Sequence, residues 1–181
     1  MQAVTTLKEE HMVILEFLDQ LALAGERVLQ NKFPPKEFFD KAVGFAREFA
    51  DKFHHYKEED IMFRVLAQKH AGALDNDLEK LRQQHEHCRT YISAIAASAE
   101  GCVAGSDSEA RILHRNLVDY VETLRSHISF ENVTFFPRIV RELSSDELAA
   151  LATEFGKWDE KMGGATYEEA KKTVKAMTEC L

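Results

Sequence analysis

The sequence predicts an all-α protein, specifically an antiparallel up-down four-helix bundle with a short C-terminal helical appendage. Apolar residues recur at helical spacing through several long stretches, and alternating β-branched runs typical of strands are nearly absent. Residues that cap or break helices separate these stretches. A chain of 181 residues, 45% hydrophobic and 30% charged, is typical of a soluble domain with a full core.

A proline pair separates the first two predicted helices. Thr6-x-x-Glu9 has the form of a capping box and predicts a first helix that ends near Asn31. Pro34-Pro35 interrupts the chain and predicts the start of a second helix, which continues towards Gly72.

The third and fourth predicted helices have start signals of their own. Asp75 or Asn76 can cap the third helix, which should end near Gly101. Ser106-x-x-Glu109 predicts the start of the fourth. Pro137 should kink this helix, because proline lacks a backbone N–H and crowds the carbonyl four residues earlier.

Two shorter helices are predicted after the fourth. Ser144-x-x-Glu147 and Thr166-x-x-Glu169 are capping boxes, and the flexible Gly163-Gly164 pair lies between the helices they begin. We therefore expect a four-helix bundle over residues 1–143 and a C-terminal helical appendage over residues 144–181 that packs on it.

Two stretches of the chain carry the same helical motif. His54-x-x-x-Glu58 and His127-x-x-x-Glu131 each place an imidazole and a carboxylate on one helical face, one turn apart. An isolated histidine precedes each motif, and 43 residues separate His11 from His54 while 42 separate His85 from His127. Chance supplies about one His-x-x-x-Glu pair in this composition, but not this order and spacing. The pattern predicts four histidines and two glutamates facing inward, which is a dinuclear metal site.

His54 and His55 compete for the inward position on the second helix. His55 also begins a His-x-x-x-Glu pair, with Glu59, but its neighbours on that face are polar. We therefore expect His54 and Glu58 to face the core. The histidines expected outside the core are His55, His70, His87 and His114.

The predicted ligands favour iron over other metals. Two buried carboxylates would each cost several kcal/mol if they were ionised and unpaired, and a cation removes this cost. Imidazole and carboxylate without thiolate favour iron, with manganese or zinc less favoured. The prediction is two iron ions, oxo- or hydroxo-bridged, with one open position on each.

These residues resemble the hemerythrin-like proteins, also called the HHE cation-binding domain family. The resemblance covers roughly residues 7 to 142 and includes the Glu58-Glu59-x-Ile61-Met62-Phe63 and Phe135-Phe136-Pro137 runs. It implies that the metal ligands are His11, His54, Glu58, His85, His127 and Glu131. The chain departs from the oxygen-carrying hemerythrins at Arg89, where they place a further histidine. It departs again at Glu131, since they place an aspartate five residues after the last histidine.

A site with one histidine fewer than the carriers is more open. It implies a non-haem di-iron protein that binds, senses or reduces small oxidants such as oxygen, peroxide or nitric oxide, and it leaves turnover open. One alternative is an iron-centre repair or iron-donor stress protein, because the family's repair proteins have similar sites. Another is an oxygen-binding or sensing module without turnover. Tyr120, two turns before His127 on the same stripe, is a candidate donor to a bound ligand, and a core role is its alternative.

Composition restricts the partners and the compartment. A net charge of −8 disfavours nucleic acid and anionic membranes, so we expect a small diatomic or peroxide ligand. The first residues lack a secretory pattern, which predicts a cytoplasmic protein. Cys88, Cys102 and Cys180 are odd in number and widely spaced, and we expect them to be reduced thiols.

Overall fold

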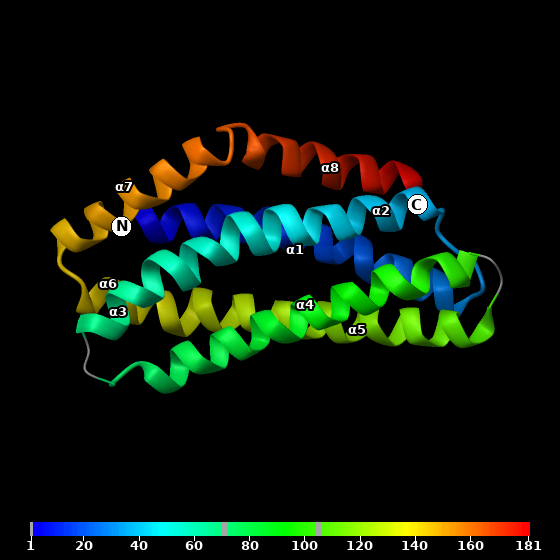
Figure 1. Cartoon of the computed structure of the whole chain (residues 1–181), viewed down its shortest axis with the longest axis horizontal. Coiled ribbons are helices and arrows are strands. Elements are labelled where there is room, and N and C mark those ends of the chain that lie inside the picture. The colour runs from blue at the N-terminus through cyan, green and yellow to red at the C-terminus, as the bar shows by residue number, and fades with distance from the viewer. Residues whose placement is uncertain (1, 70–71, 104–105) are drawn as a thin grey trace.

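The computed structural model describes residues 2–69, 72–103 and 106–181, and every regular element in these ranges is a helix. The prediction of an all-α protein is confirmed. The long helical stretches pack against one another, and successive stretches run in opposite directions (Figure 1). No helix among the described residues combines the length and the apolar character needed to cross a lipid bilayer.

Some of these stretches contain π-helical segments, labelled η, in which a backbone N–H bonds the carbonyl five residues earlier. The first stretch is α1 (Gln2–Leu29), and the third is α4 (Asp75–Val103). The second stretch consists of α2 (Lys36–Phe45), η1 (Ala46–His55), η2 (Lys57–Met62) and α3 (Phe63–Lys69). The fourth consists of α5 (Asp107–Phe130), η3 (Glu131–Phe135) and α6 (Phe136–Glu142). The chain ends with α7 (Ser145–Lys161) and α8 (Thr166–Cys180).

The long helices pack against one another as neighbours. Helix α4 packs against α5, α5 against α1, and α2 against α4. The final two helices cover one side of this assembly, where α7 contacts α1 and η2 while α8 contacts α1, α2 and η1 (Figure 1). Residues after 144 therefore lie on the two stretches that carry His11 and His54.

The predicted helix starts are partly corrected. Ser144 and Glu147 form a complete capping box, and Ser106 accepts a hydrogen bond from the backbone N–H of Glu109. Thr6 does not cap α1, because the helix begins four residues earlier and the Thr6 hydroxyl donates to the Gln2 carbonyl at 3.2 Å. Burial of Ala3 and Val4 in an apolar cluster extends the helix in this direction.

The last predicted capping box is also wrong. Thr166 is the first residue of α8 and not its cap, and its hydroxyl donates to the Met162 carbonyl at 3.0 Å. The preceding turn uses Gly163 and Gly164, whose φ angles of 108° and 69° lie in the left-handed region that favours glycine.

Helical geometry changes where the candidate ligands lie. The second stretch is π-helical around His54 and Glu58, and the fourth is π-helical from Glu131. Immediately before Pro137, the Phe136 N–H bonds the Glu131 carbonyl five residues earlier. The predicted disturbance at this proline thus takes the form of a widened turn.

A layer of buried polar residues separates two apolar clusters. One cluster includes Phe17, Phe45 and Leu117, and the other includes Leu7 and Phe135. Each long stretch passes from one cluster to the other and contributes at least one buried histidine in between. The candidate site is therefore enclosed by apolar packing at both ends.

Candidate metal centre

Two overlapping groups of buried side chains form the candidate metal centre. In each group, one nitrogen or oxygen atom per residue lies within 4.8 Å of the others. One group is His11, His54, Glu58 and Glu131, and the other is His55, Glu58, His85 and His127. All six residues predicted as ligands are buried and come together here. Glu58 belongs to both groups, so it is placed to bridge two cations.

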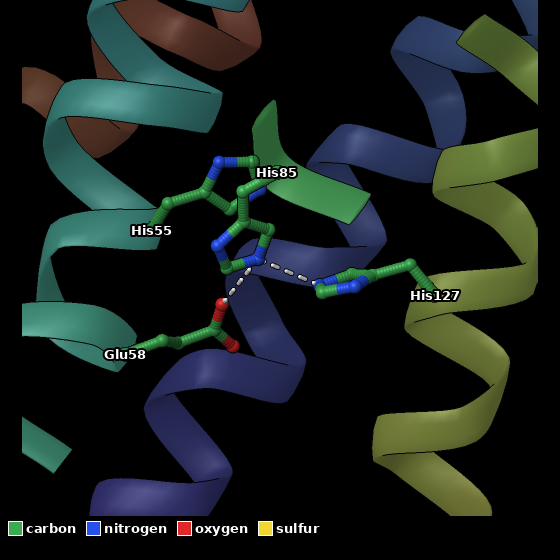
Figure 2. A group of neighbouring side chains, drawn as sticks. All are labelled: His55, Glu58, His85 and His127. Atoms are coloured by element: carbon green, nitrogen blue, oxygen red, sulfur yellow. Dashed lines mark hydrogen bonds and ion pairs between the residues drawn. The ribbon is translucent and has the colours of Figure 1, made fainter. Parts of the chain in front are cut away.

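The expectation that His55 faces solvent is wrong. Its side chain is only 2% exposed, and its ring stacks on that of His85 with 3.7 Å between centroids. Figure 2 shows His55 and Glu58 reaching from one stretch towards His85 and His127 on two others. The π-helical geometry of η1 explains the error, because a wider turn lets the adjacent His54 and His55 both face the interior.

The two glutamates connect the groups through their oxygens. Glu58 Oε1 lies 3.5 Å from His54 Nε2, and Glu58 Oε2 lies 3.4 Å from His85 Nε2. Glu131 Oε2 lies 3.2 Å from His11 Nε2 and 3.1 Å from His127 Nε2. Each carboxylate thus approaches a histidine of either group, which is the placement of bridging carboxylates in a dinuclear centre.

The Nδ1 atom of every histidine in the two groups contacts an oxygen acceptor. These contacts join His11 to Asn132 at 3.0 Å, His54 to Glu10 at 2.7 Å, His55 to Asp51 at 3.3 Å, His85 to Glu59 at 2.7 Å and His127 to Gln84 at 3.2 Å. An Nδ1–H that donates to oxygen leaves the Nε2 lone pair free, and this is the arrangement of metal-binding histidines. All five Nε2 atoms are therefore available as ligands.

Several of these inward atoms have no hydrogen-bond partner. They are Nε2 of His11, His54 and His55, and both carboxylate oxygens of Glu58 and Glu131. The Nε2 atoms of His85 and His127 face each other at 3.0 Å, as the dashed line in Figure 2 indicates. Two lone pairs at this distance repel unless a proton or a cation lies between them or beside them. The donor set therefore fits divalent or trivalent cations and matches the imidazole and carboxylate ligands of iron.

Aromatic rings enclose the histidines. Phe63 and Phe136 each lie five residues after one of the glutamates. The Phe136 ring stacks on His11 at 5.7 Å between centroids, and Phe63 stacks on His85 at 6.4 Å. The phenylalanine that lies five residues after each glutamate thus has the same role in both motifs, since its ring limits the movement of a histidine ring and excludes water.

Burial controls the protonation of the site without metal. Burial and the neighbouring histidines lower the pKa of His54 and His85. Burial lowers the pKa of His55 to about 4, although Asp51 opposes this shift. Burial and the Glu131 carboxylate raise the pKa of Glu58 well above its ordinary value. Burial also opposes ionisation of Glu131, but the nearby imidazoles outweigh it and lower that pKa.

A cavity of about 150 Å³ adjoins only one of the two groups. His55 and His85 form part of its wall, together with Cys88, Arg89 and Tyr120. At about 30 Å³ per water molecule, the cavity has room for roughly five waters or a small ligand. Burial raises the pKa of the Cys88 thiol to about 12, so Cys88 stays protonated at neutral pH.

Arg89 forms hydrogen bonds with the two carboxylates that contact His55 and His85 of the cavity wall. Its guanidinium donates to Asp51 Oδ1 at 2.9 Å and to Glu59 Oε1 at 2.8 Å, and these carboxylates contact Nδ1 of His55 and His85. Position 89 is where the oxygen-carrying hemerythrins place a further histidine. In the structure, Arg89 fixes the outer contacts of two histidines, and His55 brings the number of inward histidines to five.

The remaining predicted positions divide between surface and core. His87 is exposed, as predicted, and His114 is partly exposed. His70 lies outside the described residues. Tyr120 is buried, packs edge-on against Phe17 and lines the cavity, so it combines a core position with access to a ligand.

Sequence comparisons relate the chain to a cation-binding domain family and to a curated protein described as an iron-sulfur cluster repair protein. The family model for the hemerythrin HHE cation binding domain matches residues 2–139. A "Probable iron-sulfur cluster repair protein" of Haemophilus influenzae is 22% identical over 91 residues, which represent 49% of this chain and 41% of that protein. The chain therefore matches less than half the length of this curated relative. No solved structure matches the chain significantly.

The family match covers both groups of buried side chains. It begins before His11 and ends after Glu131, and it spans well over half of the chain. The chain therefore belongs to the hemerythrin HHE cation-binding domain family.

Proposed function

We propose that this protein holds a non-haem di-iron centre that binds, senses or reduces a small oxidant such as oxygen, peroxide or nitric oxide. The observation that carries the proposal is the convergence of five histidine Nε2 atoms and two glutamates in a buried layer, with every Nδ1 already engaged. His11 and His54 would hold one iron, and His55, His85 and His127 the other, with Glu58 and Glu131 bridging them. The framework would be an antiparallel four-helix bundle over residues 1–143.

The two iron positions would differ in their ligands and in their access. The position with three histidines adjoins the cavity, whereas the position with two histidines lies beside Glu10 and the C-terminal helices. Bound iron supplies redox chemistry and Lewis acidity. The cavity then supplies an approach for a small ligand, and the Tyr120 hydroxyl can donate a hydrogen bond to it.

Iron-sulfur cluster repair is the second candidate function. It is favoured by the sequence similarity to the Haemophilus influenzae protein, whose description names iron-sulfur cluster repair. In this role the protein would donate iron to a damaged cluster or protect it. The three free cysteines fit a reducing compartment, which supports the proposal that the protein acts in the cytoplasm.

Reconstitution with ferrous iron under anaerobic conditions, followed by exposure to air, tests the proposal. We expect two irons per chain and a visible absorption of an oxo- or hydroxo-bridged pair, and the His85→Ala variant should lose both. Consumption of peroxide or nitric oxide by the loaded protein distinguishes turnover from binding. Transfer of iron to a protein with a damaged iron-sulfur cluster, without oxidant consumption, would favour repair. A wild-type protein that retains no iron contradicts both functions.

A further inference from the structure

Lys57 is a fully buried lysine beside the metal centre. It precedes Glu58 in η2, its side chain has no solvent exposure, and its ammonium lies over the Phe53 ring at 3.7 Å from the centroid. A buried ammonium requires compensating partners, because removal of a charge from water is costly. The partners of Lys57 come from two other helices.

These partners connect the C-terminal helices to a candidate ligand. The Lys57 ammonium lies 2.5 Å from Asp159 Oδ1 of α7 and forms a close ion pair with Glu10 Oε1 of α1. The other Glu10 oxygen accepts from His54 Nδ1 at 2.7 Å. A continuous path of charged contacts therefore runs from Asp159 through Lys57 and Glu10 to His54.

Trp158, which precedes Asp159 in α7, makes further contacts with the second helical stretch. The Trp158 indole N–H donates to the Phe53 carbonyl at 3.2 Å, near the end of the π-helical stretch η1. The Trp158 ring also stacks on Tyr56, with 3.8 Å between centroids. Helix α7 is thus fixed to the backbone that carries His54 by contacts at Phe53 and Tyr56 as well as at Lys57.

We propose that α7 supports the metal centre, and that its residue Asp159 is a positioning residue for His54, acting through Lys57 and Glu10. The inference rests on the proposed metal function. It goes beyond the family match, which ends at residue 139, because it assigns a role to a helix outside that region.

Two physical effects lead from Asp159 to the iron held by His54. Asp159 keeps the Lys57 ammonium between two carboxylates, so that Glu10 remains oriented towards His54 Nδ1. Asp159, whose carboxylate is 36% exposed, also contributes a negative charge next to the fully buried Lys57 ammonium, and charges influence one another more strongly near the buried side of such a pair than in water. Loss of this charge leaves the positive charge of Lys57 less compensated and favours the less positive, reduced state of the iron.

The test compares Asp159→Asn with Glu154→Gln in the full chain loaded with iron. Glu154 is an exposed carboxylate of the same helix that pairs with Lys157 of that helix, so its variant is a matched control. Two quantities are measured: iron retention against a chelator and the reduction potential, from the visible spectrum during a redox titration. Asp159→Asn should retain iron about tenfold less well, at the lower end of the range for outer partners of metal ligands. It should also have a more positive potential, while Asp159→Glu restores both values and Glu154→Gln changes neither.

The outcomes separate this inference from the metal function. Wild-type retention and potential in Asp159→Asn would overturn the inference, although the iron site would stand. Weaker retention with an unchanged potential would indicate general destabilisation and would also overturn it. If Asp159→Asn does not fold, Trp158→Phe takes its place, because it removes the N–H bond to Phe53 while an aromatic ring remains next to Tyr56, and wild-type iron retention in this variant counts against the inference. A wild-type chain that binds no iron contradicts the metal function itself.

Discussion

Acid should destabilise the metal-free protein, and His55 should account for a measurable share of the loss. The folded-state pKa of His55 is lowered by burial to about 4 from an ordinary value of 6.5. Between these two values the unfolded chain binds a proton that the folded protein does not. The stability contributed by the neutral imidazole is therefore fully present above pH 6.5 and is lost as the pH falls through 4.

The size of this share follows from the difference between the two pKa values. Since one pKa unit corresponds to about 1.4 kcal/mol, His55 alone should reduce the free energy of unfolding by about 3 kcal/mol between pH 7 and the acid limit. His54 and His85 have lowered pKa values and act in the same direction. Asp51 remains ionised over most of this range, because its hydrogen bonds with His55 and Arg89 lower its pKa to about 2 against the effect of burial.

Urea denaturation of metal-free wild type and His55→Phe, from pH 7 to pH 4, measures the effect. Phenylalanine keeps an aromatic ring stacked on His85 and removes the titrating nitrogen atoms. The variant should lose less stability than wild type over this range, by up to about 3 kcal/mol. His87→Phe is the matched control, because His87 is exposed and its replacement should leave the pH profile unchanged. Identical profiles for His55→Phe and wild type would refute the assignment of His55 to the buried layer.

Three further predictions concern the ligands and their supports. His54→Ala should lower the iron content of reconstituted protein sharply, whereas His87→Ala should bind as much iron as wild type in the same metal analysis. Glu58→Gln should be more stable than wild type at alkaline pH without metal. The raised pKa of Glu58 contributes stability below pH 4.5, and this contribution is lost as the pH rises through the folded-state pKa. Equal urea midpoints of the two proteins above about pH 8 would contradict this prediction. Arg89→Met should release the two carboxylates that hold His55 and His85 and should weaken iron binding about tenfold in a chelator competition, and unchanged affinity would show that the arginine is not needed to orient them.

The repeated motif was sufficient to predict most of the buried layer. His54 with Glu58, and His127 with Glu131, each share a helical face, and apolar neighbours indicate which face is buried. The helical class and the order of the long stretches follow from caps and prolines, which act locally. Thr6 and Thr166 show where this reasoning fails, because each hydroxyl donates to the carbonyl four residues earlier instead of capping a helix. Burial of Ala3 and Val4 extends α1 back to Gln2, and the turn before α8 is set by Gly163 and Gly164.

His55 could not be assigned from periodicity, since helical periodicity holds only for regular α-helical geometry. At 3.6 residues per turn, adjacent residues diverge by about 100°, and only one of His54 and His55 can face the core. In the π-helical stretch the turn is wider, so that both His54 and His55 can face the core. The sequence carried a signal in the His54-His55 pair itself, because two adjacent histidines that each begin a His-x-x-x-Glu pair are compatible with a wider turn.

Four of the five outer contacts of the histidines follow a rule that is visible only with the structure, and the fifth, between His55 and Asp51, lies within one stretch. A residue adjacent to a ligand on one stretch holds the ligand of the next stretch: Glu10 contacts His54, Glu59 contacts His85, Gln84 contacts His127, and Asn132 returns to His11. These four contacts close a ring around the centre and connect all four long stretches. Each acceptor stands in the sequence beside a ligand, but its own partner lies on another stretch, so pairing requires the relative register of the stretches. Because His11 Nδ1 is held from the last stretch and His54 Nδ1 from the first, the inward Nε2 atoms are oriented by the packing of the whole bundle, and a shift of any one stretch should weaken metal binding at both positions.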